Sequence, residues 1–136
     1  MTETNKVSLN PIISARNFLA GIIKEAKNDY EKAGAIQSFE ICYELSWHFC
    51  QKILSLRNIR VFSPKETFRA AGLERLIEDP EAWFDFGLKR NLTTHTYDGK
   101  IALEILEYLP KFLAELDKLI KNLKEIEECY YDSTGK

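Results

Sequence analysis

One short segment of the chain groups side chains that can act on phosphates. It holds Arg90, Asn91, His95 and Tyr97 with polar spacers between them. An arginine is permanently cationic, and its guanidinium fork binds phosphate oxygens. A histidine exchanges protons near neutral pH. Together the two can cleave RNA without a metal ion, because the ribose 2′-hydroxyl supplies the nucleophile, histidine moves the proton and arginine stabilises charge at phosphorus.

The spacing of the segment decides whether these side chains can meet. On an unbroken α-helix a step of five residues turns about 500°, which leaves Arg90 and His95 roughly 140° apart. Arg90 and Tyr97 would share a face of such a helix. The first pair converges only if the helix breaks at Leu92–Thr94 or if two copies meet across a two-fold axis. Adjacent threonines and the following Asp98-Gly99 are weak helix formers, so a break is expected.

The same residues also have an interpretation without chemistry. In it Arg90 is a surface charge, His95 is a helix cap and Tyr97 is a core contact. Residue types this common recur by chance in a short segment. The spacing alone therefore leaves both interpretations open.

Two apolar patterns precede the segment. Asn10 as a cap and Pro11 as the first helical residue predict a helix that runs to about Asn28–Tyr30, with a break near Gly34. A second helix is predicted from about Lys32 to Leu56, and its apolar residues cover most of its circumference, which is typical of a central helix. Its polar residues, spaced for contacts along one strip, are Glu40, Glu44, His48 and Lys52. We expect the two glutamates to face solvent rather than to orient His48 or bind a partner.

Start and stop signals divide the second half of the chain. The run Ser63-Pro64-Lys65-Glu66 is a complete capping-box pattern, and the short helix after it is expected to end with Gly72 in a left-handed conformation. Asp79-Pro80 opens a helix that runs towards Arg90. A last helix begins near Asp98, and Pro110 should kink or restart it.

These patterns predict an all-α fold, namely an antiparallel four-helix up-and-down bundle with one short extra helix. We expect the bundle to span residues 10–128, between a flexible N-terminus at 1–9 and a flexible tail at 129–136. Trp47 and Trp83 are expected to anchor the core rather than to stack on bases. Surplus apolar surface on the first or last helix would form a dimer interface.

Composition limits the classes of function. The 136 residues include 19 basic and 21 acidic ones, and a net charge of -2 argues against a general polyanion binder. The three cysteines follow no framework spacing, and neither a signal pattern nor an apolar run of membrane length occurs, so we expect a cytoplasmic protein with reduced thiols. The spacing of Cys42, His48 and Cys50 does not place three metal ligands on one helix face, and no cofactor is expected.

Several motifs together resemble a known family. The order arginine, four residues, histidine, one residue, tyrosine, with asparagine directly after the arginine, resembles the signature of HEPN-domain proteins of the HepT type. Other matching stretches look like the nucleotidyltransferase substrate-binding family, which belongs to the same group. They are residues 35–40 and 43–47, which look like its second helix, and then Ser63–Glu66, Trp83 and Arg90–Asp98 in the family's order. The resemblance covers roughly residues 10–125.

The resemblance implies a small helical bundle that dimerises with the motif at or near the interface and binds a minimal nucleotidyltransferase. The resemblance is compatible with two functions. In the first, the chain would be the substrate- or nucleotide-binding subunit of a two-component transferase. In the second, it would be a toxin, a metal-independent endoribonuclease whose antitoxin partner attaches AMP to the motif tyrosine. Carried over, Arg90 and His95 are the ribonuclease pair, Tyr97 is the modified or nucleotide-contacting residue, and Asn91 supports the arginine.

We rank the partner subunit first, because it holds under both of these functions. The ribonuclease is the alternative, and a structural helical dimer, with Arg90 and His95 buried in separate contacts, is the second. The chain has no Gly-Ser pair followed by paired aspartates, so a nucleotidyltransferase active site would lie on the partner. Whether the chain is itself an enzyme stays open at this point. Expected partners are the transferase, a second copy, and a nucleotide or RNA, with neither membrane nor DNA.

Overall fold

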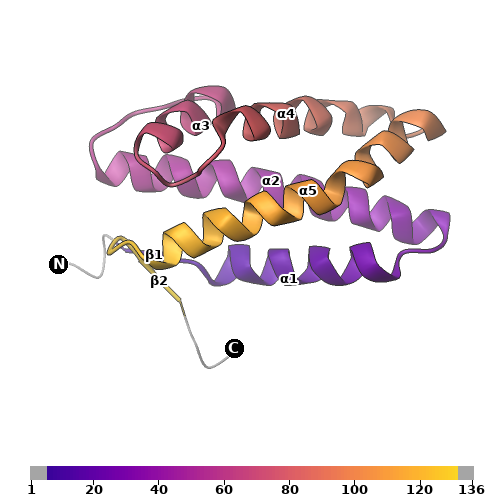
Figure 1. The fold of residues 1–136 in the computed structure, drawn as a ribbon, viewed down its shortest axis with the longest axis horizontal. Coiled ribbons are helices and arrows are strands. Elements are labelled where there is room, and N and C mark those ends of the chain that lie inside the picture. The colour runs from indigo at the N-terminus through magenta and orange to yellow at the C-terminus, as the bar shows by residue number, and fades with distance from the viewer. Residues whose placement is uncertain (1–5, 132–136) are drawn as a thin grey trace.

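The computed structural model describes residues 6–131 and confirms the all-α bundle (Figure 1). Four long helices run up and down in alternation, and a short helix lies at one end beside the second and fourth. Their bounds are α1 Asn10–Glu25, α2 Asp29–Leu56, α3 Pro64–Leu73, α4 Pro80–Asn91 and α5 Gly99–Lys124. The helix α2 packs against all four others, which agrees with its nearly all-round apolar surface.

The break between the first two helices lies earlier than expected. α1 ends at Glu25, and α2 already begins at Asp29, so Gly34 lies inside α2. The reason is a capping box that the apolar pattern concealed: Asn28 Oδ1 accepts from the Glu31 backbone N–H at 2.8 Å, and the Glu31 carboxylate accepts from the Asn28 N–H at 3.2 Å. At the other end of α1 the cap is Leu9, one residue before the expected Asn10.

The short helix α3 departs from its predicted caps at both ends. Ser63 Oγ accepts from the Glu66 N–H at 3.2 Å, but the Glu66 carboxylate accepts from the Phe62 N–H at 2.9 Å, so only half of the expected box forms. The left-handed residue after α3 is Arg75, with φ 64°, and Gly72 is still helical. A glycine is required at position 72 for a different reason. A Cβ there would clash with the Pro80 Cγ, so the missing side chain allows Pro80 to pack closely against α3.

The stretch between α4 and α5 has the predicted break. α4 starts at the expected cap Asp79 and ends at Asn91, where the backbone tightens into a 3₁₀ turn over Leu92–His95. The side chain of Asp98 then caps α5 by accepting from the Lys100 N–H at 2.9 Å. α5 continues through Pro110 without restarting.

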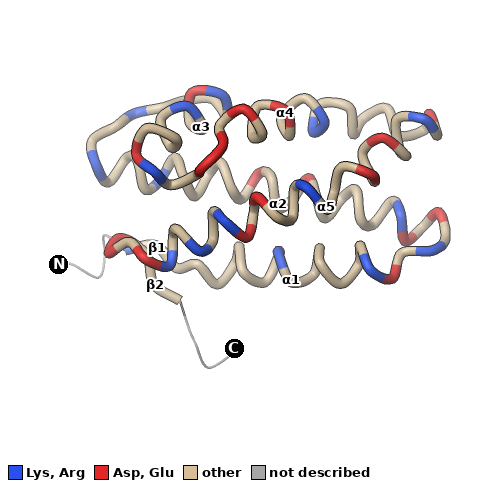
Figure 2. The backbone as a smooth tube through the Cα atoms, viewed as in Figure 1, with Lys and Arg blue, Asp and Glu red and all other residues tan. Residues whose placement is uncertain are grey.

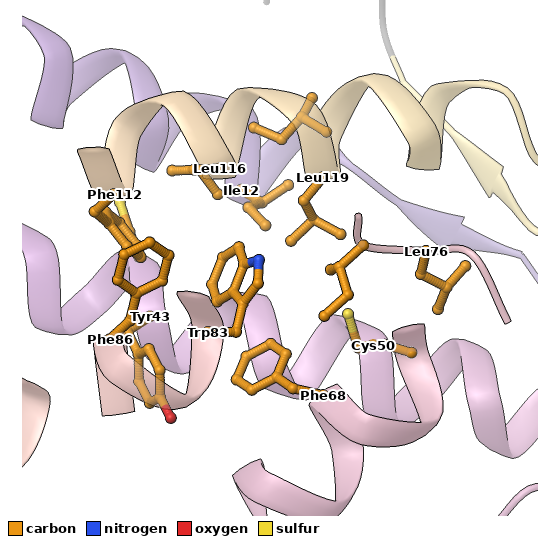
Figure 3. Close-up of a cluster of buried hydrophobic side chains, with 14 of the residues drawn as sticks. Ile12, Tyr43, Cys50, Phe68, Leu76, Trp83, Phe86, Phe112, Leu116 and Leu119 are labelled. Atoms are coloured by element: carbon orange, nitrogen blue, oxygen red, sulfur yellow. The ribbon is translucent and has the colours of Figure 1, made fainter. Parts of the chain in front are cut away.

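The core confirms Trp83 as an anchor (Figure 3). Its side chain is fully buried and lies 4.7 Å, between ring centroids, from the stacked ring of Phe68. Phe86 and Phe112 approach it edge to face at 5.1 and 5.6 Å. The predicted stripe of α5 faces this cluster, with Phe112, Leu116 and Leu119 labelled in Figure 3. α4 is thereby fixed against both α3 and α5.

The two ends of the described chain are tied together, against the expectation that 1–9 and 129–136 flank the bundle as flexible segments. β1 (Val7–Ser8) pairs in parallel with β2 (Cys129–Tyr130), and the Val7 N–H donates to the Glu128 carbonyl at 2.8 Å. Val7, Leu9 and Cys129 are buried. Two-residue strands carry no alternation, so the sequence pattern gave no sign of them. The other residues of these two segments, 1–5 and 132–136, lie outside the described residues.

Charges of both signs are scattered over the bundle (Figure 2). Several pair between elements, such as Arg16 on α1 with Asp117 on α5 at 2.6 Å. Among residues 6–131 no helix is long and apolar enough to cross a membrane.

Candidate functional site

Arg90 is held from the central helix by two carboxylates. It lies in the last turn of α4, where its Nη1 is 3.3 Å from Glu40 Oε2 and its Nε is 3.3 Å from Glu44 Oε2, both on α2. Thr93 completes the arrangement, because its buried hydroxyl accepts from Arg90 Nη1 at 3.2 Å and donates to Glu40. The side chain of Arg90 is only 30% exposed. The interpretation of Arg90 as a plain surface charge is therefore wrong.

Two glutamates that the sequence pattern did not assign to the site join it. Glu40 and Glu44 were expected to face solvent, whereas both hold Arg90. Their spacing of four residues, which places both on one strip of α2, was the available signal. Glu44 also accepts from the Trp47 indole N–H at 3.0 Å and lies 3.7 Å from His48 Nε2, as the predicted strip requires.

His95 and Tyr97 form a second, separate contact. His95 Nδ1 lies 3.2 Å from the Tyr97 hydroxyl, and the two rings meet edge to face with centroids 5.8 Å apart. Tyr97 is 84% exposed, so its interpretation as a core contact is wrong. The His95 side chain is also exposed and contacts this tyrosine rather than capping a helix. A phenol with a ring nitrogen at hydrogen-bond distance can lose its proton to that nitrogen when it attacks an electrophile.

Within one chain Arg90 and His95 do not meet. The predicted break at Leu92–Thr94 is present, but among residues 6–131 no hydrogen bond, ion pair or ring contact joins the two side chains. Arg90 turns back to α2, whereas His95 is at the far end of the 3₁₀ turn. Of the two ways for the pair to converge, the local break is insufficient, and the meeting of two copies stays a prediction.

A cleft opens beside the arginine between α2, α3 and α4. Its volume is about 480 Å³. Arg90 and the exposed Asn91 lie on its wall, together with Lys65 from the first turn of α3. The apolar wall includes Phe84 and Leu88 from α4. Since these residues come from three helices, no single stretch of sequence indicated the cleft.

The thiols once considered beside His48 belong to the core. Cys42 and Cys50 are fully buried, and burial raises the pKa of each thiol to about 12. His48 lies on the surface with its ring centroid 4.0 Å from that of Trp47, which is partly buried against the core. Within residues 6–131 no group of three or more His, Cys, Asp and Glu side chains is arranged to hold a metal ion.

Comparison with known proteins shows which family the chain resembles. The model of the family described as nucleotidyltransferase substrate binding protein like matches residues 7–125. A relative from Haemophilus influenzae, named probable ribonuclease HepT, is 34% identical over 98 residues, which cover 68% of this chain and 67% of that protein.

Two solved structures share the bundle. One, from Haemophilus influenzae, is reported to reveal the fold of a substrate binding domain of a nucleotidyltransferase; it is 28% identical, covers 86% of this chain and 99% of its own, and superposes with a TM-score of 0.79. The other, a crystal structure from Thermus thermophilus, is 26% identical and covers 84% of this chain and 99% of its own, with a TM-score of 0.78. The sequence match and the shared bundle agree, and the chain belongs to the HepT-like family of nucleotidyltransferase substrate-binding proteins.

Proposed function

We propose that the chain is the helical partner subunit of a minimal nucleotidyltransferase, as the HepT-like half of a two-component pair of the toxin-antitoxin type, and that it presents Tyr97 to the transferase. One observation carries this proposal: the Tyr97 side chain is 84% exposed, with its hydroxyl 3.2 Å from His95 Nδ1. An exposed tyrosine beside a proton acceptor has the chemistry of a nucleotidyl acceptor.

The transfer step follows from that contact. The phenol oxygen of Tyr97 forms a bond to the α-phosphorus of a nucleoside triphosphate, and the bond from that phosphorus to the bridging oxygen breaks. Pyrophosphate leaves, and the phenol proton passes to His95 Nδ1. The triphosphate comes from the transferase subunit, because this chain has no transferase motif of its own.

The test is the intact mass of the chain expressed with a nucleotidyltransferase encoded beside it. We expect mass added in steps of one nucleotidyl group in the wild type and in the control Tyr30→Phe, whose side chain is 90% exposed at the start of α2. Tyr97→Phe should stay unmodified. His95→Gln should slow the modification by on the order of a hundredfold, with His48→Gln as its control. Added mass that persists in Tyr97→Phe would remove Tyr97 from the proposal, and a chain that neither binds nor is modified by the transferase would remove the whole of it.

A second candidate is a metal-independent ribonuclease that uses Arg90 and His95. Two observations favour it: the matched relative is named a probable ribonuclease, and Arg90 is held in a defined position on an open cleft. Since Arg90 and His95 are separate in one chain, this activity needs a second copy to bring them together. The second alternative, a purely structural dimer, also implies separate contacts for Arg90 and His95. It requires His95 to be buried, however, and the His95 side chain is exposed.

The ribonuclease is tested with RNA and a chelator. Cleavage that survives the chelator, fails in Arg90→Ala and His95→Ala, and persists in His48→Ala would support it. Nucleotidyl groups on Tyr97 should block the same cleavage, because they would add negative charge beside His95. If purified wild type and His95→Ala both leave RNA intact, the activity is absent and the partner-subunit function is unaffected.

A further inference from the structure

We propose that the cleft between α2, α3 and α4 binds a nucleoside monophosphate unit, with its base against Phe84 and its phosphate at the start of α3 beside Lys65. This inference rests on the proposed function and deepens it, because it gives the bound nucleotide a site away from Tyr97. A volume of about 480 Å³ lies within the range of about 300–1,000 Å³ in which proteins hold small ligands. The mixture of aromatic, cationic and polar walls suits a planar ring that carries an anion.

An unpartnered hydroxyl group lies on the wall of the cleft. Tyr43 on α2 is only 4% exposed, and its ring packs on Phe68 with centroids 5.7 Å apart. Its hydroxyl makes no hydrogen bond within residues 6–131, and the oxygen itself is not fully buried, so it is open to a ligand in the cleft. The oxygen lies beside Gly87, where a Cβ would be 2.7 Å away, and both residues line the cleft. Figure 3 shows this oxygen pointing away from the buried cluster. A ligand with a donor or acceptor at this depth would satisfy it.

The start of α3 supplies a place for an anion. The cap Ser63, the first residue Pro64 and Lys65 all line the cleft, so this ten-residue helix turns its N-terminus towards it. The partial positive charge of a helix N-terminus favours a phosphate. Pro64 has no N–H and the Glu66 N–H donates to Ser63 Oγ, so in this first turn the Lys65 N–H remains for the anion. The ammonium group of Lys65 adds a full charge at the same end.

The aromatic wall supplies a place for a base. Phe84 on α4 is partly exposed, and its ring has Lys65 Nζ 5.5 Å and the guanidinium carbon of Arg69 5.8 Å from its centroid. An aromatic ring with adjacent cations is the combination on which bases of single nucleotides stack while their phosphates are neutralised. Leu88, whose side chain is largely exposed, extends the same wall by one turn of α4.

The negative charge of Glu44 on the cleft wall excludes a phosphate from the end near Arg90. Glu44 lines the cleft and would repel an anion near Arg90, whose Nε and Nη1 already face Glu44 and Glu40. The Lys65 end is the better phosphate site, because Glu66, the acidic residue next to Lys65, does not line the cleft and accepts from the Phe62 N–H at 2.9 Å. Arg90 Nη2, which donates no hydrogen bond within residues 6–131, remains for an oxygen of the ribose or base.

The experiment is isothermal titration of the purified full chain with AMP, adenosine and inorganic phosphate. We expect AMP to bind more tightly than either of the other two. Lys65→Ala should weaken AMP binding by about tenfold, because a charge-assisted contact is lost, and Tyr43→Phe by about fivefold, because one neutral hydrogen bond is lost. Lys121→Ala and Tyr30→Phe, at two residues that do not line this cleft, are the matched controls and should change it less than about twofold.

A short oligoadenylate identifies the source of the nucleotide unit. Binding tighter than that of AMP, and weakened by the same two substitutions, would assign the cleft to a residue of an RNA chain. Binding weaker than that of AMP would assign it to a free nucleotide. The inference is overturned if phosphate alone binds as tightly as AMP, or if Lys65→Ala and Tyr43→Phe bind AMP as the wild type does. Modification of Tyr97 is read from mass, so either result can fail while the other stands.

Discussion

Arg90 Nη1 on α4 lies 3.3 Å from Glu40 Oε2 on α2, so the cation of the motif is fixed by the central helix of the bundle. Both side chains are about seven-tenths buried. Glu44 and Thr93 add further contacts to the same guanidinium. An arginine held by several groups loses less conformational freedom when it binds an anion than a free one does.

Glu40→Ala should lower the free energy of unfolding by about 1–2 kcal/mol, because it removes one of the two carboxylates paired with Arg90 and the carboxylate that accepts from the buried Thr93 hydroxyl, at a site that water partly reaches. Urea unfolding followed by circular dichroism measures this. Glu107→Ala on the exposed face of α5 is the control, with a change within about 0.5 kcal/mol. Equal losses in the two variants would contradict a stabilising role for the contact.

The Arg57 cluster predicts a loss of stability in acid. Arg57 Nε lies 2.7 Å from Glu128 Oε2, and Nη1 lies 3.1 Å from Glu74, so one side chain joins the end of α2, the end of α3 and the segment before β2. The hydrogen bond from Arg57 lowers the pKa of the Glu128 carboxyl below its ordinary 4.5. A lowered pKa contributes stability that is present above 4.5 and is lost as the pH falls through the value in the folded protein.

Arg57→Ala should therefore cost about 1–2 kcal/mol at pH 7, and the difference from wild type should shrink as the pH falls below about 4.5. Urea midpoints measured from pH 7 to pH 3 check this. Lys52→Ala, an exposed cation on the same helix, is the control. A difference that stays constant across this range would show that Arg57 acts by packing and not through the carboxylate.

Two glycines should respond in opposite directions to alanine. A Cβ at Gly72 would clash with Pro80 Cγ, a ring atom that cannot turn away, so Gly72→Ala should destabilise the fold by about 1–3 kcal/mol. A Cβ at Gly21 on α1 meets nothing within 4 Å, and Gly21→Ala should stabilise by up to about 1 kcal/mol through helix propensity. Thermal unfolding of both variants gives the comparison. A stabilised Gly72→Ala would contradict the close approach of α3 and α4.

The three thiols should resist alkylation in the folded protein. Burial raises the pKa of Cys42 and Cys50 to about 12 and that of Cys129 to about 11, so almost no thiolate is present at pH 8. Iodoacetamide followed by intact mass should add nothing quickly to the native chain and three groups to the chain unfolded in urea. Rapid labelling of Cys129 alone would mean that the β1–β2 pair opens readily.

Much of the fold was predictable because its signals are local. The stripe that includes Phe112 and Leu116 repeats at helical spacing, and Asp79-Pro80 marks the start of a helix within two adjacent residues. The wrong predictions of helix ends arose where two local signals competed or where a residue from the next helix came into contact. The capping box at Asn28 ended α1 earlier than the apolar stripe suggested, and Pro80 rather than backbone conformation explains Gly72.

The sequence by itself determined the helices, the apolar faces that bury the core and the presence of Arg90, His95 and Tyr97 in one short segment. The tertiary structure decided what those residues touch. Glu40 meets Arg90 only because α2 packs on α4. Caps and apolar stripes act over a few residues and are visible in the chain, whereas ion pairs and clefts between helices depend on how those helices pack.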